Sequence, residues 1–176
     1  AILSKNPIRK VELKSEGSST LSARKIWYDS TVQRLNVDSR GELLGEFNAE
    51  DRILVINQKG DVQLIKPQMT THFDEDMIVI EKHVPKKPIS AIYFDGQKKS
   101  YFVKRFLADD HENKYSVINS DKGSFLEIIS TDWIPMVEIV FVKQKGKERK
   151  TKELNLSDFI SIKGSKARGV YWTKPD

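Results

Sequence analysis

Short runs of alternating apolar and polar residues, separated by turn-forming residues, make up most of the chain from Lys25 onward. A period of two is typical of half-buried β-strands. Residues 52–66 (RILVINQKGDVQLIK) hold two such runs around residues 58–61 and predict a β-hairpin in which Gly60 supplies a positive φ. No stretch longer than about ten residues has helical periodicity. The pattern therefore predicts an all-β chain of about ten to fourteen strands.

Other segments predict strands by the same alternation and turn chemistry. The predicted hairpins lie at 25–37, 89–106 (turn at 95–96), 114–130 (turn at 121–123) and 136–154 (turn at 145–146), with a single strand at 77–84 and one short helical turn within 153–162. Residues 1–22 are polar and contain KSEGSSTLS, so we expect a linker in which the alternating residues 8–13 (IRKVEL) form one leading edge strand. Residues 23–176 are then a single β domain.

The predicted hairpins resemble one another. Residues 53–66 can be laid over residues 91–105, so that Ile65-Lys66 falls near Val103-Lys104, and the two starts are about 38 residues apart. A period of this size in an all-β chain suggests blades of a propeller-like array. About three units fit into the chain, fewer than the four to eight of a closed propeller. We expect an incomplete or open array, or a different all-β fold with accidental similarity.

Composition narrows the class of protein. The chain has no cysteine, which excludes disulfides and thiolate metal sites and makes a reducing cytoplasm the expected compartment. It has no apolar run of the ~20 residues that a membrane span needs, and its first residues lack the apolar core of a signal peptide. The chain does not begin with Met, so we expect a fragment of a longer protein.

Charge is unevenly distributed. Residues 143–176 hold ten Lys and Arg against four Asp and Glu, whereas the remaining 142 residues sum to −1 and the whole chain to +5. A concentrated basic segment favours an acidic partner, and nucleic acid is the obvious one. The alternative is a solvated edge that keeps the protein soluble.

Residues for catalysis or metal binding are missing. His72 is close in sequence to Asp74 and Asp76, but the spacing fits no known metal site, and a solvated acidic loop is the favoured interpretation. His83 and His111 have no neighbours suited to nucleophilic catalysis, and no phosphate-binding glycine loop or catalytic motif occurs. We expect no active site, no metal and no cofactor in this chain.

Cations recur on or beside the predicted strands and turns: Lys59, Lys66, Lys98, Lys99, Lys104, Arg105, Lys122, Lys143, Lys145 and Lys147. Equivalent turns of a repeat lie on one rim, and a curved basic rim suits a bent DNA duplex, which carries one charge per ~1.7 Å of its axis. For any single lysine the alternative is stronger, since exposed lysines protect sheet edges from aggregation. Among the aromatic residues, which are expected mainly in the core, Tyr101 is the best candidate for stacking on a base.

Three segments together resemble a known family: AIYFDGQKKSYFVKRF (91–106), YSVINSDKGSFLEIIS (115–130) and LSDFISIKGSKARG (156–169). In this order and spacing they are similar to the C-terminal domain of the A subunit of bacterial type IIA topoisomerases, DNA gyrase and topoisomerase IV, in its short Bacteroides-type variant. The resemblance covers about residues 23–174. It implies a β-pinwheel of about three to four blades that binds and bends duplex DNA around a positively charged rim.

The chain departs from gyrase in one motif. The Q-x-R-G-G-K-G box of gyrase, which serves DNA wrapping, is missing; Arg40-Gly41 and Lys166–Gly169 are the nearest segments. The resemblance therefore implies binding and bending without gyrase-like wrapping, closer to topoisomerase IV. The catalytic Tyr and the ATPase of the full enzyme lie outside the fragment, so we expect no enzymatic activity from it.

The sequence thus predicts a domain that presents duplex DNA to the catalytic core, with the rest of the A subunit and the ATPase B subunit as partners and the nucleoid as its place in the cytoplasm. The predicted DNA-binding residues are Lys59, Lys66, Lys98, Lys99, Lys104, Arg105, Lys143, Lys145, Lys147, Arg149, Lys150, Lys163, Lys166 and Arg168. The alternative is a protein-interaction module without DNA affinity. A β-rich enzyme domain ranks last, because no acid, base or nucleophile constellation is present.

Overall fold

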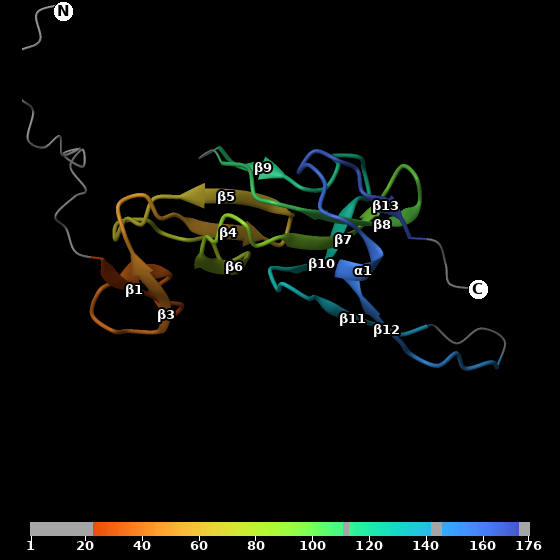
Figure 1. The fold of residues 1–176 in the computed structure, drawn as a ribbon, viewed down its shortest axis with the longest axis horizontal. Helices are drawn as coiled ribbons and strands as arrows, with labels where there is room; N and C mark the ends of the chain where they lie inside the picture. The colour runs from red at the N-terminus through yellow and green to blue at the C-terminus, as the bar shows by residue number, and fades with distance from the viewer. Residues whose placement is uncertain (1–22, 111–112, 142–145, 173–176) are drawn as a thin grey trace, which may run out of the picture.

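The computed structural model describes residues 23–110, 113–141 and 146–172, which form a row of antiparallel β-sheets (Figure 1). The described residues contain thirteen strands and one four-residue helix, so the all-β prediction is confirmed. No sheet closes on itself within these ranges. The edge strand predicted at residues 8–13 lies outside the described residues.

The strands are short, and their bounds agree with most of the predicted runs. They are β1 (Arg24–Asp29), β2 (Arg34–Asn36), β3 (Glu42–Phe47), β4 (Ile53–Asn57), β5 (Asp61–Ile65), β6 (Met77–Lys82), β7 (Ile89–Asp95), β8 (Ser100–Phe106), β9 (Tyr115–Ser116), β10 (Phe125–Ser130), β11 (Met136–Ile139), β12 (Lys152–Asn155) and β13 (Val170–Tyr171). The predicted helical turn is α1 (Leu156–Phe159), which the side chain of Asn155 caps.

One topology recurs along the chain. Unit 1 is built on hairpin β1–β2, unit 2 on β4–β5, unit 3 on β7–β8 and unit 4 on β11–β12. In units 1 to 3 a later strand pairs with the first strand of the hairpin: β3 with β1, β6 with β4, and β10 with β7. The similarity among the hairpins, first visible in the sequence, is thus a repeat of three-dimensional structure.

The units also exchange strands. β9 lies between β8 and β10 of unit 3 in the chain but pairs with β5 of unit 2, and β13 follows unit 4 but pairs with β8 of unit 3. Between units 1 and 2 the corresponding contact is one bridge, Arg34 with His72. The hairpin predicted at residues 114–130 is therefore wrong, because its two strands belong to different sheets. Alternation identifies a strand, but either neighbouring sheet offers an open edge that can pair with it.

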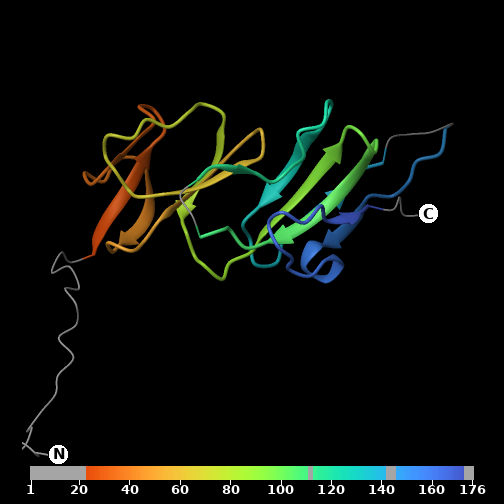
Figure 2. The same ribbon diagram turned by 90° about the horizontal axis from the view of Figure 1, so that it is seen from above.

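The apolar core lies between successive sheets, which follow one another along the long axis (Figure 2). Ile53 of β4 packs with Ile26 and Phe73 toward unit 1, whereas its neighbour Leu54 packs with Ile89 toward unit 3. On the far side of unit 3, Ile92 and Val103 pack on Leu156 and Ile160, which follow β12. Each internal sheet thus buries apolar residues on both faces, which fixes its register.

Candidate nucleic-acid interface

Lys104, predicted in the DNA-binding rim, is buried and serves the fold instead. Its side chain is 4% exposed, and its Nζ donates hydrogen bonds to the carbonyl oxygens of Val117 at 2.8 Å and Ser165 at 2.6 Å. Burial lowers the pKa of this ammonium to about 8, against the opposing effect of Asp109. In this structure the Lys104 ammonium joins three segments of chain and is not available to a phosphate, so the prediction for this residue is corrected.

A one-residue difference in turn length explains why Lys104 was predicted on the wrong face of the sheet. Asn57 and Asp95 are equivalent, because each ends the first strand of its hairpin and accepts a hydrogen bond from the N–H two residues on. The β4–β5 turn then has three residues and the β7–β8 turn four, so Ile53 pairs with Ile65 whereas Ala91 pairs with Lys104. Lys104 thus corresponds to Ile65, not to Lys66. A shift of one residue moves a strand side chain to the opposite face of the sheet.

Arg105, the second member of the basic pair, is half-buried. Its guanidinium donates a hydrogen bond to the carbonyl oxygen of Trp133 at 3.0 Å, and its own carbonyl accepts from the N–H of Lys163 at 2.8 Å. Arg105 therefore anchors the connection between β10 and β11, and its guanidinium is at most partly exposed.

Exposed cations from several units lie beside the connection between β9 and β10. The Val117 N–H donates to the carbonyl of Gly60 in the β4–β5 turn at 2.9 Å, and the Gly96 N–H of the β7–β8 turn donates to Ser124 Oγ at 2.9 Å. One segment thus touches both turns. The exposed cations beside it, named here the turn cluster, are Lys59, Lys98, Lys99, Lys122, Lys166 and Arg168.

Lys166 and Arg168, the last two members of the turn cluster, line a small cavity beside the β9–β10 connection. This cavity of about 230 Å³ is lined by Lys104, Lys166 and Arg168 together with residues 116–119. The Tyr93 hydroxyl donates to the carbonyl of Arg168 at 2.7 Å, and burial raises the pKa of this tyrosine to about 12. The segment 165–168 is therefore held against unit 3 with its two basic side chains exposed.

A polar network holds the β7–β8 turn in place. Asp95 Oδ1 accepts from the N–H groups of Gln97 and Lys98, both at 2.9 Å, and Asp95 Oδ2 accepts from the Asn119 amide at 2.7 Å. The N–H of Lys98 lowers the pKa of Asp95, and the two other donors act in the same direction against the raising effect of burial. Ser124 Oγ donates to Asn119 Oδ1 and closes the link to Gly96.

The remaining predicted cations are spread over other places. Lys66 follows β5, Lys163 lies at the far end of β8, and the β11–β12 connection carries Lys147, Arg149 and Lys150, all of them exposed. The Arg149 guanidinium lies 5.6 Å from the centre of the Phe141 ring. Lys143 and Lys145 lie outside the described residues. Lys122, which was noted at a turn but not counted among the DNA-binding residues, belongs to the turn cluster.

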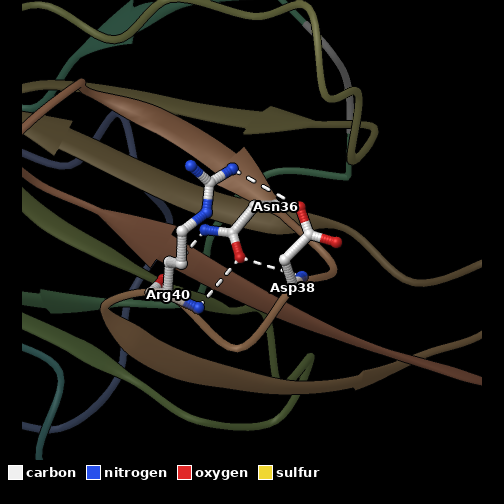
Figure 3. A network of polar contacts seen from close by, with 3 residues as sticks. All are labelled: Asn36, Asp38 and Arg40. Carbon is white, nitrogen blue, oxygen red and sulfur yellow. Dashed lines mark hydrogen bonds and ion pairs between the residues drawn. The ribbon is translucent and has the colours of Figure 1, made fainter.

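Arg40 lies in the connection between β2 and β3, where it forms a polar network with Asn36 and Asp38 (Figure 3). Asn36 Oδ1 accepts from the N–H groups of Asp38 and Arg40, both at 3.1 Å, and the Arg40 guanidinium pairs with Asp38 at 3.4 Å. Gly41 has a φ of +83°, and a Cβ there would lie 2.1 Å from the carbonyl oxygen of Tyr28. Position 41 therefore requires glycine, because the two backbones approach too closely for a Cβ atom.

The connection between β5 and β6 carries an acidic segment, residues 74–76. Asp74, Asp76 and His72 line a cavity of about 380 Å³ together with Asp61, and Lys66 and Lys114 line the same cavity. No group of three potential metal ligands comes together in the parts of the chain that are described. Exposed cations also occur in unit 1, at Arg24, Lys25, Arg34 and Arg40, so basic residues are not restricted to one part of the array.

Comparison with known proteins identifies the family of this chain. The family model described as topoisomerase C-terminal domain, Bacteroidota, matches residues 34–176. The chain belongs to this family. The resemblance inferred from the three sequence segments is confirmed, and membership relates this topoisomerase C-terminal domain to the rest of a topoisomerase and to DNA. Searches of curated proteins and of solved structures give no match.

In the part of this topoisomerase C-terminal domain that the structure describes, no helix is long and apolar enough to cross a membrane.

Proposed function

We propose that this topoisomerase C-terminal domain binds duplex DNA without sequence preference and bends it, as the C-terminal domain of a type IIA A subunit. The observation that carries the proposal is the turn cluster, in which cations from the hairpin turns of units 2 and 3, from the β9–β10 connection and from the segment that follows unit 4 lie beside one another. Lysine and arginine contacts to phosphates position DNA but carry no sequence information.

The repeated topology supports a β-pinwheel of about four blades. Units 1 to 3 share one strand order, and each exchanges pairing with a segment from farther along the chain. In such an array the β4–β5 and β7–β8 turns and the β11–β12 connection present their cations in succession. A duplex that follows this succession bends along the array and is presented to the catalytic core, with which the ATPase B subunit cooperates.

The test is fluorescence anisotropy of the 176-residue chain with a short random-sequence duplex at about 50 and about 200 mM salt. With about five phosphates neutralised, the slope of log K against log salt is expected at about −4 to −5. Lys166→Gln with Arg168→Gln should weaken binding severalfold and flatten the slope by about 1 to 2. The control, Lys25→Gln with Lys86→Gln, removes two exposed cations outside the turn cluster and should bind almost as the unchanged chain. Equal affinities of the two variants would contradict the proposal.

A second candidate is a protein contact. Trp133, Ile134 and Met136 are 54%, 65% and 58% exposed at the start of unit 4, which favours burial against the rest of the topoisomerase. Ile134→Glu with Met136→Glu should then weaken association with the A-subunit core in a co-sedimentation assay and leave duplex affinity unchanged. Loss of duplex binding alone would assign this patch to DNA.

A further inference from the structure

Three aromatic rings lie side by side on one face of unit 3, at the end that carries the β7–β8 turn. Phe94 is directly opposite Tyr101 on β8 and Phe125 on β10, so all three side chains lie on the same face of the sheet. Phe94 stacks on Phe125 with ring centroids 5.2 Å apart, and Tyr101 meets both rings edge to face. Phe94, Tyr101 and Phe125 are called here the aromatic triad.

The aromatic triad lies beyond the cover of unit 4. One step further along the same face, Ile92 and Val103 are buried against Leu156 and Ile160. At the triad this cover ends, and Tyr101 is 40% and Phe125 44% exposed. Large apolar rings that a fold leaves in solvent beside each other mark a surface for a partner.

The charges around the aromatic triad identify the partner. Lys98 and Lys99 lie in the turn that joins the strands of Phe94 and Tyr101, and Lys122 is three residues before Phe125, all of them exposed. Two carboxylates are also near in the chain, the exposed Glu127 at the β10 bulge and the half-buried Asp121. Exposed rings interleaved with an excess of cations are the arrangement with which proteins hold unpaired bases and their phosphates.

We propose that the aromatic triad, with Lys98, Lys99 and Lys122, is a binding site for single-stranded DNA. A base stacks on the exposed rings of Tyr101 and Phe125, and the lysines contact the flanking phosphates. Every base has a flat aromatic face, so the site is tolerant of sequence. The site shares Lys98, Lys99 and Lys122 with the turn cluster, whereas its aromatic rings have no part in the proposed duplex binding, so substitutions of the rings test the two proposals separately. It provides a topoisomerase domain with a means to hold a locally unpaired DNA strand.

The first experiment compares two ligands and needs no variant. The 176-residue chain is titrated with labelled oligothymidine of about twelve nucleotides and with an abasic oligomer of the same length, at about 50 mM salt. Stacking on even one ring should make oligothymidine bind about tenfold more tightly than the abasic chain. Equal binding of the two, or no binding of oligothymidine, overturns the proposal.

The second experiment locates the site. Tyr101→Ala with Phe125→Ala should lose about tenfold or more in oligothymidine affinity, whereas Tyr101→Phe, which keeps the ring, should not. Val32→Ala with Leu43→Ala is the matched control, because both side chains are 49% exposed apolar groups of unit 1, away from the aromatic triad. Duplex affinity should change little in the double variant, so failure of this site and failure of duplex binding are distinguishable. Unchanged oligothymidine binding combined with lost self-association in sedimentation would make the triad a protein contact and overturn the proposal.

Discussion

At the scale of single residues, Lys104 shows how one side chain can change its role with its register. It occupies the position of Ile65 in the preceding unit, yet its ammonium is bound by the β9–β10 connection and by the segment that follows unit 4. A buried ammonium costs free energy unless it is paired with acceptors, and here two carbonyl oxygens and the Phe106 ring, 5.1 Å away, surround it. Lys104 thus stabilises the exchange of strands.

Replacing Lys104 should therefore cost stability. We expect Lys104→Ala to lower the free energy of unfolding by about 2 to 4 kcal/mol, because two buried carbonyls lose their donor and a cavity remains. Urea denaturation followed by tryptophan fluorescence measures this loss. Lys66→Ala, at the exposed position next to Ile65, is the control and should cost less than about 0.5 kcal/mol. A loss no greater than that of the control would show that Lys104 is exposed in solution.

The lowered pKa of Lys104 predicts a pH dependence. The folded pKa of about 8 lies below that of an unfolded lysine, so the unfolded state binds more protons between the two values and stability rises with pH there. Between about pH 7 and about pH 10 the unchanged chain should gain about 1 to 2 kcal/mol relative to Lys104→Met, which cannot titrate. Denaturation of both proteins at the two pH values measures the difference. A gap that stays constant with pH would contradict the assignment.

Gly96 is a second residue whose role depends on a distant segment. A Cβ at Gly96 would lie 2.0 Å from the carbonyl oxygen of Lys122, whereas a Cβ at Gly123 meets nothing closer than 3.8 Å. We expect Gly96→Ala to displace the segment 119–124 and cost about 2 to 4 kcal/mol. Gly123→Ala should cost only about 1 to 2 kcal/mol, from its φ of +83°. Thermal melts compare the two, and the reverse ranking would refute the close packing.

At the scale of elements, the sequence predicted strands better than their partners. The alternation located nearly all strands, and the β4–β5, β7–β8 and β11–β12 hairpins pair as expected. The segment 114–130 does not, since β9 and β10 join different sheets. Local hydrogen-bonding capacity and alternation are the same for either partner, so neither could distinguish a hairpin from an exchange between units.

An engineered disulfide tests the exchange, because the chain has no cysteine of its own. Asp61 and Ser116 are directly opposite across the β5–β9 pair. We expect Asp61→Cys with Ser116→Cys to form a disulfide on oxidation, since opposite strand residues bring their Cβ atoms within about 5.5 Å. Ser116→Cys with Ile128→Cys, which a 114–130 hairpin would bring together, should stay reduced. Non-reducing gel electrophoresis reads out both, and the opposite outcome would restore the hairpin.

At the scale of the whole molecule, charge is unevenly divided along the array. Asp74 and Glu75 line a cavity with residues of unit 1, whereas the turn cluster lies beside units 2 and 3 and further cations lie on the β11–β12 connection. In the proposed duplex binding, the turn cluster attracts the phosphates and the carboxylates of residues 74–76 repel them, because like charges repel. This division also explains how a chain of only +5 net charge can carry a concentrated basic surface.

Bending should depend on how far the basic surface extends. We expect Lys147→Gln, Arg149→Gln and Lys150→Gln together to reduce the bend of a duplex more than the affinity for it, because the turn cluster still holds the DNA at its middle. Energy transfer between dyes at the two duplex ends reports the bend, and anisotropy with the same duplex reports affinity. An unchanged bend would place the β11–β12 connection off the DNA path.

The candidate DNA-binding site was predictable in composition but not in geometry. Lysines at turns were recognised because exposed turns favour them, and the turn cluster includes five of the predicted residues, among them Lys98 and Arg168. Lys104 and Arg105 were expected on the same rim, yet one is buried and the other half-buried. The face of the sheet on which a strand residue lies depends on turn length and register. A short segment such as VKRF (103–106) carries no information on either.

What could be deduced from the residues alone was local: an all-β chain, its turns, its repeat, and its family from the order of three segments. These follow from alternation and turn chemistry, which act over a few residues. The exchange of β9 and β13 between units, the burial of Lys104 and the meeting of cations around residues 115–124 arose from contacts between segments far apart in the chain, such as Tyr171 with Phe102. Such contacts depend on which open sheet edge and which apolar face lie nearest in the folded chain, and that is settled only when the units pack together.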